Sequence, residues 1–244
     1  MNNALFPMAI LAGGLATRLR PLTERIPKAL IELNGEPFIN HQLRLLRRSG
    51  INHVILCVAY LAKDIEKEVG DGKRFGLDIV YSYDGDELMG TGGAIRRALP
   101  KLGECFFVMY GDSYLECDFA KVQSSFVKST KTGLMTVYRN EGRWDASNVE
   151  FAHNDILVYD KVNRTPSMKH IDYGLGVFRK TAFLSFPETE PFDIVRIYKT
   201  LLSQHDLAAY EVTSRFYEIG SNEGILELAE YLKTKKKEKH NELY

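Results

Sequence analysis

The sequence predicts an α/β fold whose central sheet is mixed, mainly parallel and flanked by helices, and two observations support this. Over residues 1–140, short apolar runs typical of buried strands alternate with stretches whose apolar residues recur every three or four positions, as on one face of a helix. Such a βαβ succession implies parallel strands with helices on both faces of the sheet. From about residue 144, shorter extended runs predict a small antiparallel portion laid against that sheet.

The individual elements follow from the same patterns, and glycine, proline and capping residues mark their ends. Gly50 is placed to end the first helix, Thr91 to cap the third and Pro100 to stop it. Strands are predicted at residues 8–12, 53–60, 77–83, 105–110 and 133–139, and shorter extended runs at 148–151, 156–159 and 171–178. Helices are predicted at residues 37–49, 61–69, 91–99 and 119–126, and two later helices pass through residues 194–201 and 225–232.

The chain is predicted to form one domain over residues 1–244. A length of 244 residues, with 45% hydrophobic and 26% charged residues, suits a single core of ordinary size. Residues 1–140 and 141–232 form the two halves of this domain, and residues 233–244 form a charged tail. Six residues between 233 and 239 are lysine or glutamate, which is typical of a solvated helix end.

Charge and composition narrow the classes of partner. Lys and Arg number 32, as do Asp and Glu, so the zero net charge argues against a general nucleic-acid binder with a basic surface. No apolar run approaches the roughly 18 residues that a membrane span needs. The three cysteines form no CxxC pair, and the first residues lack a signal-peptide pattern. We therefore expect a cytoplasmic protein without a nucleic-acid or membrane partner; the oligomeric state has no signal in the sequence.

The segment from Leu11 to Lys28 carries the strongest chemical signal. A predicted strand ends at Gly13 and Gly14, which permit close approach of the backbone. Successive backbone N–H groups in such a loop bind anions, and cationic side chains add charge-assisted bonds to phosphate oxygens. Neither GxGxxG nor GxxxxGK[ST] occurs, so a dinucleotide fingerprint and a P-loop are not indicated. The polar and cationic residues of the loop are Thr17, Arg18, Arg20, Arg25 and Lys28.

This segment resembles the N-terminal signature of the sugar-1-phosphate nucleotidyltransferases, roughly L-A-G-G-x-G-T-R-L-x-P-L-T-x-x-x-P-K-P. It departs from that signature at Ala16, where the family has glycine, and at Ala29, where it has proline. If residue 16 requires a positive φ, an alanine there costs about 1 kcal/mol and weakens triphosphate binding. The resemblance implies a Rossmann-like nucleotide-binding core. The matching residues are Gly13, Gly14, Thr17, Arg18, Leu19, Pro21, Leu22, Thr23, Pro27 and Lys28, and Leu11 and Ala12 join them as expected nucleotide contacts.

Residues 86–95 resemble the segment with which this family meets the nucleobase. In the family, backbone groups and an acidic or amide side chain contact the base, and the glycines let the backbone lie close to the ring. The resemblance implies four contacts of this kind here: Glu87, Gly90, Thr91 and Gly92.

Two acidic residues are expected to hold Mg²⁺. The run Tyr110-Gly111-Asp112 resembles the family's G-D element, whose aspartate binds the metal. A carboxylate just past the end of a buried central strand can reach a metal that bridges phosphates. Glu218, in the run from Phe216 to Gly220, occupies the place of the family's second metal carboxylate, where an aspartate is usual.

The second half of the chain is expected to bind the sugar phosphate. Asp160 and Lys161 resemble the family's E-K pair, in which the lysine contacts the sugar phosphate and the acid a sugar hydroxyl. Asp172 and Gly174 lie in a run similar to the family's N/D-A-G element beside the sugar ring, and Asn148 also suits a sugar-hydroxyl contact.

The resemblance implies that an NTP and a sugar 1-phosphate react to give an NDP-sugar and pyrophosphate. Arg18 would hold the departing pyrophosphate, and Lys28 would bridge the triphosphate near its α-phosphoryl group. Asp112 and Glu218 would carry Mg²⁺, while Lys161 steers the sugar phosphate. Catalysis would then consist of positioning and charge neutralisation.

The substrates are indicated only by resemblance. The sequence looks most like bacterial heptose- or mannose-1-phosphate guanylyltransferases, which favours GTP with heptose or mannose 1-phosphate, for bacterial cell-surface polysaccharide precursors. N-acetylmuramate-1-phosphate uridylyltransferases are similarly short, and cytidylyltransferases share the first motif. Ala16 and Glu218 also leave open a non-catalytic, regulatory paralogue that binds nucleotide sugars.

Overall fold

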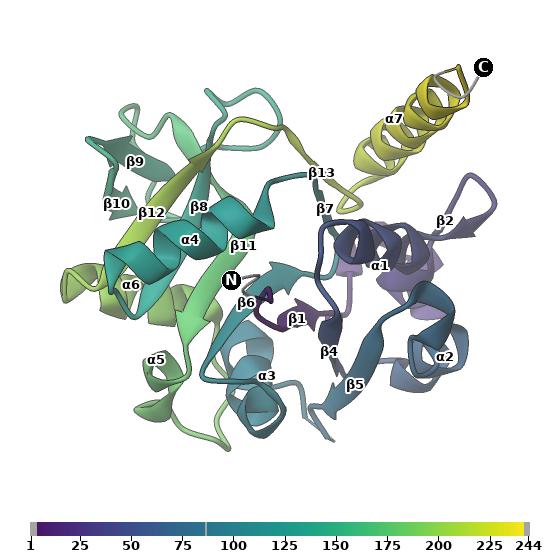
Figure 1. Ribbon diagram of the computed structural model, residues 1–244, viewed down its shortest axis with the longest axis horizontal. Helices are drawn as coiled ribbons and strands as arrows, with labels where there is room; N and C mark the ends of the chain where they lie inside the picture. The colour runs from purple at the N-terminus through teal and green to yellow at the C-terminus, as the bar shows by residue number, and fades with distance from the viewer. Residues whose placement is uncertain (1–3, 86, 242–244) are drawn as a thin grey trace.

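The computed structural model describes residues 4–85 and 87–241, with side chains up to residue 238. One nine-stranded sheet runs through both halves of the sequence, and helices cover it on both faces (Figure 1). The predicted mixed α/β sheet is confirmed. Asp86, which begins the segment expected to meet the nucleobase, and residues 242–244 of the predicted tail lie outside the described residues.

Four strands from the first 110 residues form the parallel part of the sheet, in the order β6-β1-β4-β5. Because they are parallel, all four end at the same edge, and the loops that follow them meet there. Helices α1, α2 and α3 connect these strands in sequence order. The elements are β1 (Met8–Leu11), α1 (Phe38–Arg48), β4 (His53–Val58), α2 (Ala62–Val69), β5 (Asp78–Tyr83), α3 (Gly90–Ala98) and β6 (Cys105–Tyr110).

The rest of the sheet is built around β11 (His170–Arg179), which runs antiparallel to β6 on one side and to β8 (Gly133–Arg139) on the other. A hairpin of β9 (Val149–Ala152) and β10 (Asp155–Tyr159) continues the sheet from the start of β11. The strand β12 (Leu207–Val212), which the sequence analysis missed, pairs in parallel with β8. Its sequence, Leu-Ala-Ala-Tyr-Glu-Val, lacks the regular apolar–polar alternation that marks a strand.

Alternating residues of the strands enter two apolar cores, one on each face of the sheet. Met8 and Ile10 belong to the core beneath α1, α2 and α4 (Phe119–Ser129). Ala9, between them, belongs to the core beneath α3, α5 (Thr181–Leu184) and α6 (Ile194–Ser203). Burial on both faces explains why β1 is apolar throughout rather than alternating.

A short antiparallel ribbon extends beyond the sheet and carries the end of the chain. It pairs β7 (Ser113–Leu115), directly after β6, with β13 (Phe216–Glu218). The terminal helix α7 (Asn222–Asn241) packs on this ribbon and then runs away from the body at the upper right of Figure 1. Tyr114, Ile219 and Leu228 form part of a third, smaller apolar cluster between the ribbon, α1 and α7.

Aromatic and cationic side chains connect this ribbon to the loop around residue 144 and to α7. The Arg215 guanidinium carbon lies 3.2 Å from the ring centroid of Trp144 and 4.6 Å from that of Tyr217. Tyr217 in turn stacks on Tyr231 of α7, with 4.3 Å between ring centroids. The loop around residue 144, β13 and α7 are thereby joined in one stack, in which cation–π and aromatic contacts add to ordinary burial.

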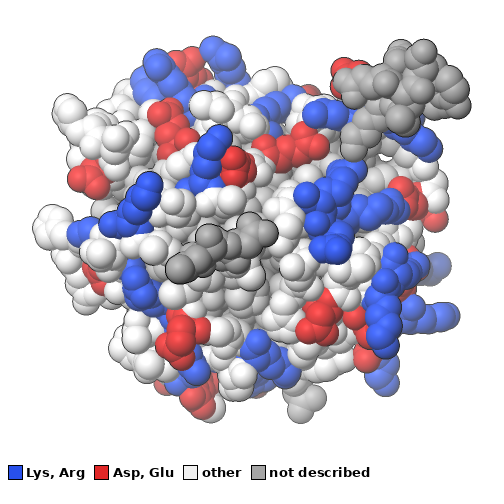
Figure 2. All heavy atoms as spheres, in the orientation of Figure 1, with Lys and Arg blue, Asp and Glu red and all other residues white. Residues whose placement is uncertain are grey.

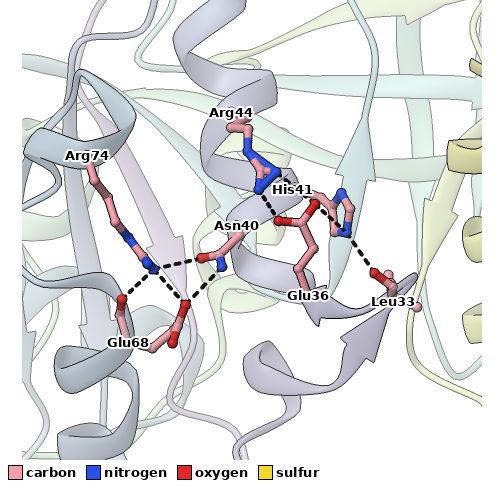
Figure 3. Close-up of polar contacts among 7 residues, drawn as sticks. All are labelled: Leu33, Glu36, Asn40, His41, Arg44, Glu68 and Arg74. Atoms are coloured by element: carbon pink, nitrogen blue, oxygen red, sulfur yellow. Dashed lines mark hydrogen bonds and ion pairs between the residues drawn. The ribbon is translucent and has the colours of Figure 1, made fainter. Parts of the chain in front are cut away.

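Polar contacts fix α1 between the preceding hairpin and α2 (Figure 3). The Asn40 side chain donates to Glu68 at 2.9 Å and accepts from Arg74 at 3.2 Å. One turn further along α1, Arg44 donates to Glu36 in the hairpin of β2 (Glu32–Leu33) and β3 (Glu36–Pro37). These side chains satisfy one another, so we assign them a structural role in holding the segment that follows residue 28.

The start of α3 differs from the prediction. The helix begins at Gly90, so Thr91 lies in its first turn and is not its cap; the Thr91 hydroxyl instead accepts from the Ile194 N–H at 2.8 Å and holds the start of α6. A Cβ atom added at Gly92 would lie 2.3 Å from the Phe192 ring. Gly92 therefore permits close packing of α3 on the segment before α6.

The surface carries both signs of charge. On the face shown in Figure 2, both Lys and Arg side chains and Asp and Glu side chains are scattered among uncharged residues. None of the helices in the described ranges combines the length and the apolar character needed to span a membrane.

Replacing Gly92 with alanine is expected to destabilise the fold. The clash with Phe192 costs about 1–3 kcal/mol and outweighs the roughly 1 kcal/mol that alanine gains over glycine in a helix. Urea unfolding should show a lower midpoint with an unchanged slope. Gly103→Ala is the control, because its Cβ would approach nothing closer than 3.8 Å; equal midpoints for the two variants would contradict this packing role.

Candidate functional site

A cavity of about 310 Å³ lies at the edge of the sheet where the parallel strands end. Leu11 at the end of β1, Cys57 near the end of β4, Asp84 just after β5 and Tyr110 at the end of β6 all line it. Ligands of open α/β sheets bind at this edge. Most of the predicted nucleotide contacts line the same cavity: Leu11, Ala12, Gly13, Gly14, Lys28, Gly90 and Thr91.

Close approach of β1 and β6 requires the glycine that follows β6. The Gly111 N–H donates to the Leu11 carbonyl at 3.0 Å, and a Cβ at Gly111 would lie 2.4 Å from that carbonyl oxygen. The glycine thus lets Asp112 leave the sheet directly beside the loop after β1. It is this approach that brings the two halves of the site together.

Lys28 and Asp112 form an ion pair at one side of the cavity. The Lys28 ammonium donates to Asp112 Oδ2 at 2.6 Å, and the two side chains are 17% and 28% exposed. Lys28 begins the short 3₁₀ turn η3 (Lys28–Leu30), and Asp112 follows β6. The structure therefore places together two of the predicted catalytic residues, which are 84 positions apart in the sequence.

The ribbon of β7 and β13 brings Glu218 close to Asp112. Glu218 lies opposite Ser113 in the register of the two strands, and the Ile219 N–H donates to the Asp112 carbonyl at 3.0 Å. Burial raises the pKa of the Glu218 carboxyl above its usual value, and the negative charges of Asp112 and Asp145 raise it further. Two carboxylates close enough to repel each other in this way suit a site that receives a cation.

Asp112 and Glu218 are the residues that could hold a metal ion. Within the described part of the chain, no group of three or more His, Cys, Asp or Glu side chains has the arrangement of a metal site. A pair of carboxylates beside a phosphate-binding loop nevertheless fits Mg²⁺, which keeps several waters and takes substrate phosphates as further ligands. The donor set is therefore compatible with the predicted cofactor.

The loop between β1 and α1 contains the strained residue that the sequence suggested. Ala16 has φ 48° and ψ 44°, in the left-handed region that favours glycine. Its carbonyl accepts a hydrogen bond of 2.8 Å from the hydroxyl of Thr23, which is 3% exposed. A partly buried hydrogen bond within the loop thus supports this backbone conformation at Ala16.

Asp84 is a cavity residue that the sequence analysis did not identify. It is 6% exposed, and its Oδ2 atom accepts from the Met89 N–H at 3.0 Å. Burial raises the pKa of its carboxyl, against the lowering effects of that hydrogen bond and of Arg97. A buried carboxylate with a perturbed pKa in a cavity is a marker of function. A lone aspartate after a strand has no characteristic spacing to other residues. Its burial, which depends on the folded chain, is the feature that identifies it.

Lys161 belongs to a polar network whose other side chains are largely buried. Its ammonium donates to the Tyr110 hydroxyl at 3.2 Å and lies 3.4 Å from Asp172 Oδ2. The Asp172 side chain is only 2% exposed and also accepts from the Tyr159 hydroxyl at 3.1 Å. Since Tyr110 lines the cavity, the lysine predicted to steer the sugar phosphate is connected directly to the wall of the cavity.

The other residues predicted to bind the sugar phosphate make contacts within the protein. Asp172 Oδ1 accepts from the Gly174 N–H at 3.0 Å, and its own N–H donates to Asn148 Oδ1 at 2.9 Å. Asp160 pairs with Lys199 at 2.8 Å, which holds the pKa of the Asp160 carboxyl below its usual value. These contacts support the turn that presents Lys161; direct contact with a sugar stays a prediction for Asn148, Asp160, Asp172 and Gly174.

Some predicted contacts do not line the cavity. Thr17 and Arg18 are exposed in the 3₁₀ turn η1 (Thr17–Leu19), and Glu87 is exposed in the loop before α3. Arg18 is nevertheless close enough for its charge to act on the pKa of Glu218. Gly92 faces Phe192 rather than the cavity.

Glu218→Gln is expected to stabilise the metal-free protein at neutral pH. Because the pKa of Glu218 is raised in the folded state, its ionised form costs stability once the pH rises from the unfolded-state value, near 4.5, through the folded-state value. The thermal unfolding midpoint of the variant should exceed that of the wild type at pH 7, and the difference should vanish as the pH falls below about 4. Glu104→Gln, at an exposed position, serves as the control and should show no such pH-dependent gain. A lower midpoint for Glu218→Gln at pH 7 would show that its charge is stabilising.

Comparison with known proteins relates this site to one family. The family model described as nucleotidyl transferase matches residues 8–146, more than half of the chain. The mannose-1-phosphate guanylyltransferase catalytic subunit beta of Drosophila melanogaster is 30% identical over 243 residues, which cover 96% of this chain and 65% of that protein. The N-acetylmuramate alpha-1-phosphate uridylyltransferase of Neisseria meningitidis serogroup B is 39% identical over 111 residues, or 45% of this chain and 48% of that protein. The chain thus spans less than two thirds of the length of these relatives.

Solved structures share the fold. HddC from Yersinia pseudotuberculosis, determined in complex with GMP-PN, aligns over 93% of this chain and 100% of its own with a TM-score of 0.78 and 23% identity. The inositol-1-phosphate CTP transferase from T. maritima aligns over 92% and 93% with a TM-score of 0.75 and 20% identity. Several of the residues that carry the resemblance in the sequence line one cavity, and the chain belongs to the nucleotidyl transferase family.

Proposed function

We propose that this protein transfers a guanylyl group from GTP to a sugar 1-phosphate, giving a GDP-sugar and pyrophosphate. The observation that carries the proposal is the convergence of Lys28, Asp112 and Glu218 beside the cavity that Asp84 also lines. The first three supply the charges that nucleotidyl transfer needs, and Asp84 supplies an acceptor group for a base. The guanylyltransferase and uridylyltransferase relatives support the reaction class.

The reaction is a direct displacement at phosphorus. An oxygen of the sugar phosphate attacks the α-phosphorus of the nucleotide, the bond from that phosphorus to the oxygen bridging to the β-phosphorus breaks, and pyrophosphate leaves with the bonding electrons. The attacking oxygen is already an anion, so a covalent enzyme intermediate is not needed. The protein contributes by holding both substrates in line and by neutralising their charge.

Each cationic side chain then has a distinct place. Lys28 would leave its ion pair with Asp112 and bind the α-phosphate. A triphosphate that follows the loop from Gly13 would bring its α-phosphate next to Lys28. Arg18, exposed at the outer part of that loop, would contact the pyrophosphate as it departs. Lys161 would bind the acceptor phosphate from the other side of Tyr110. Mg²⁺ bound by Asp112 and Glu218 would supply additional neutralisation of charge on the phosphate oxygens.

Asp84 favours guanine over the other bases. Guanine presents two adjacent donors, N1–H and the 2-amino group, and a carboxylate can accept from both. Uracil presents one donor flanked by two carbonyl acceptors, which repel a carboxylate. Asp84 Oδ2 accepts from the Met89 N–H, and Asp84 lines the cavity, where its carboxylate would meet the edge of the base. The guanylyltransferase relatives and the guanine nucleotide bound by HddC support the same choice.

Mannose or heptose 1-phosphate is the acceptor that we propose, for precursors of bacterial cell-surface polysaccharide made in the cytoplasm. The proposal rests on the mannose-1-phosphate relatives of this chain. Pyrophosphate release across four NTPs and several sugar 1-phosphates tests it directly. Turnover restricted to UTP would favour the uridylyltransferase alternative, and nucleotide binding without turnover on any pair would favour a regulatory role.

Lys28→Ala and Asp112→Ala should each lower kcat/KM for the best substrate pair by roughly 10²–10³, the usual effect of removing one charge-stabilising group. Circular dichroism should show an unchanged fold, since the ion pair is partly exposed. Lys63→Ala, at an exposed position in α2, is the control and should keep wild-type turnover. Near-wild-type activity of either Lys28→Ala or Asp112→Ala would contradict this mechanism.

Asp84→Asn should reduce selectivity for GTP. The amide oxygen would take over the hydrogen bond from the Met89 N–H, so the amide NH₂ would face the donors of guanine. The two guanine donors would then meet an amide NH₂ in place of a carboxylate oxygen, which costs about 1–3 kcal/mol, or roughly 5- to 150-fold in kcat/KM for GTP. Reactions with UTP and CTP should change far less, and Asp155→Asn, at the exposed start of β10, should change none of them. A uniform fall for all nucleotides would remove Asp84 from base selection.

A further inference from the structure

Tyr110 connects the nucleotide cavity with the lysine expected to receive the acceptor. Its ring lines the cavity next to Gly111 and Asp112, and its hydroxyl accepts from the Lys161 ammonium at 3.2 Å. The same ammonium lies 5.0 Å from the centroid of the Tyr110 ring, within the range of a cation–π contact. Among the residues that line the cavity, Tyr110 therefore also belongs to the Lys161 network.

The Tyr110 ring has little room to move. A Cβ atom at Gly174 would lie 3.3 Å from the ring carbon Cδ2, so the absence of a side chain at Gly174 accommodates the ring. Gly174 has φ 92° and sits in the irregular part of the pairing between β11 and β8. The backbone carbonyl of Tyr110 accepts from the Gln42 side chain at 3.4 Å. Ring and backbone are thus both held by neighbouring elements.

Asp172 provides the second fixed contact for Lys161. Its carboxylate is buried and accepts from the Gly174 N–H and the Tyr159 hydroxyl, so it cannot turn outward without leaving these donors unpaired. Lys161 is 37% exposed and lies on the turn after β10. A free lysine side chain samples many rotamers, and two rigid partners restrict it before a ligand arrives. The chain thus presents a preorganised ammonium group beside Tyr110, which lines the cavity.

We propose that Tyr110 is a positioning residue for the acceptor: its hydroxyl and ring hold the Lys161 ammonium at the edge of the nucleotide cavity, so that the acceptor phosphate is bound next to the α-phosphate. The inference rests on the proposed function and extends it to a residue that acts through another. It predicts an effect on the sugar 1-phosphate and none on the nucleotide. A purely structural tyrosine in the cavity wall would affect both substrates.

Tyr110→Phe is the test, because it removes the hydroxyl and keeps the ring. With the best substrate pair, KM for the sugar 1-phosphate should rise about tenfold, as expected for one hydrogen bond to a charged group, and KM for the nucleotide should stay within twofold. Tyr138→Phe removes a phenol hydroxyl from β8, where the ring packs on Tyr173 and Phe216, and should leave both KM values unchanged.

A double-mutant cycle with Lys161→Met shows whether Tyr110 acts through the lysine. In the Lys161→Met background, Tyr110→Phe should have no further effect on the acceptor KM, whereas independent actions would multiply. An unchanged acceptor KM in Tyr110→Phe, equal increases in both KM values, or independent effects in the cycle would each overturn the inference while leaving the proposed function intact. A wild-type protein without turnover on any substrate pair would overturn the proposed function and this inference together.

Discussion

The ion pair between Lys28 and Asp112 depends on how two adjacent strands end. β1 and β6 are parallel neighbours, so the loops that follow them start at the same edge of the sheet, and Gly111 lets those loops approach within hydrogen-bonding distance. A partly exposed ion pair contributes little to stability. In the proposed reaction, it provides two opposite charges that the substrates separate: a phosphate binds the lysine, and a cation binds the aspartate.

The position of Glu218 depends on parts of the chain that lie after the segment matched by the family model. β13 pairs only over three residues with β7, which is too short a ribbon to be stable alone. Arg215 between Trp144 and Tyr217, and Tyr231 stacked on Tyr217, hold it in place. The terminal helix therefore has a role in the site even though none of its side chains up to residue 238 lines the cavity. It keeps an acidic group beside Asp112, although burial, and then the negative charges of Asp112 and Asp145, raise the pKa of Glu218.

The apolar runs predicted the parallel strands, and the resemblance to the family placed Lys28 and Asp112 in one expected site, but neither predicted that the two side chains form an ion pair. The sequence did not predict Asp84, whose importance arises from burial by neighbours distant in sequence. It also missed β12, which is a strand because β8 is there to pair with it rather than because of its own pattern. Thr91 was assigned to the wrong helix for a similar reason: its hydroxyl serves the start of α6, 103 residues later. Local propensity identifies elements well, and the tertiary contacts between them decide what their ends do.

Ala16 shows how such a contact changes the interpretation of a residue. From the sequence, a left-handed alanine in the phosphate loop is expected to weaken triphosphate binding by about 1 kcal/mol. In the structure Ala16 has this conformation, and its carbonyl accepts a hydrogen bond from the Thr23 hydroxyl. This hydrogen bond offsets part of the cost of the left-handed backbone at Ala16. An alanine can therefore occupy the place of the family's glycine without changing the course of the loop.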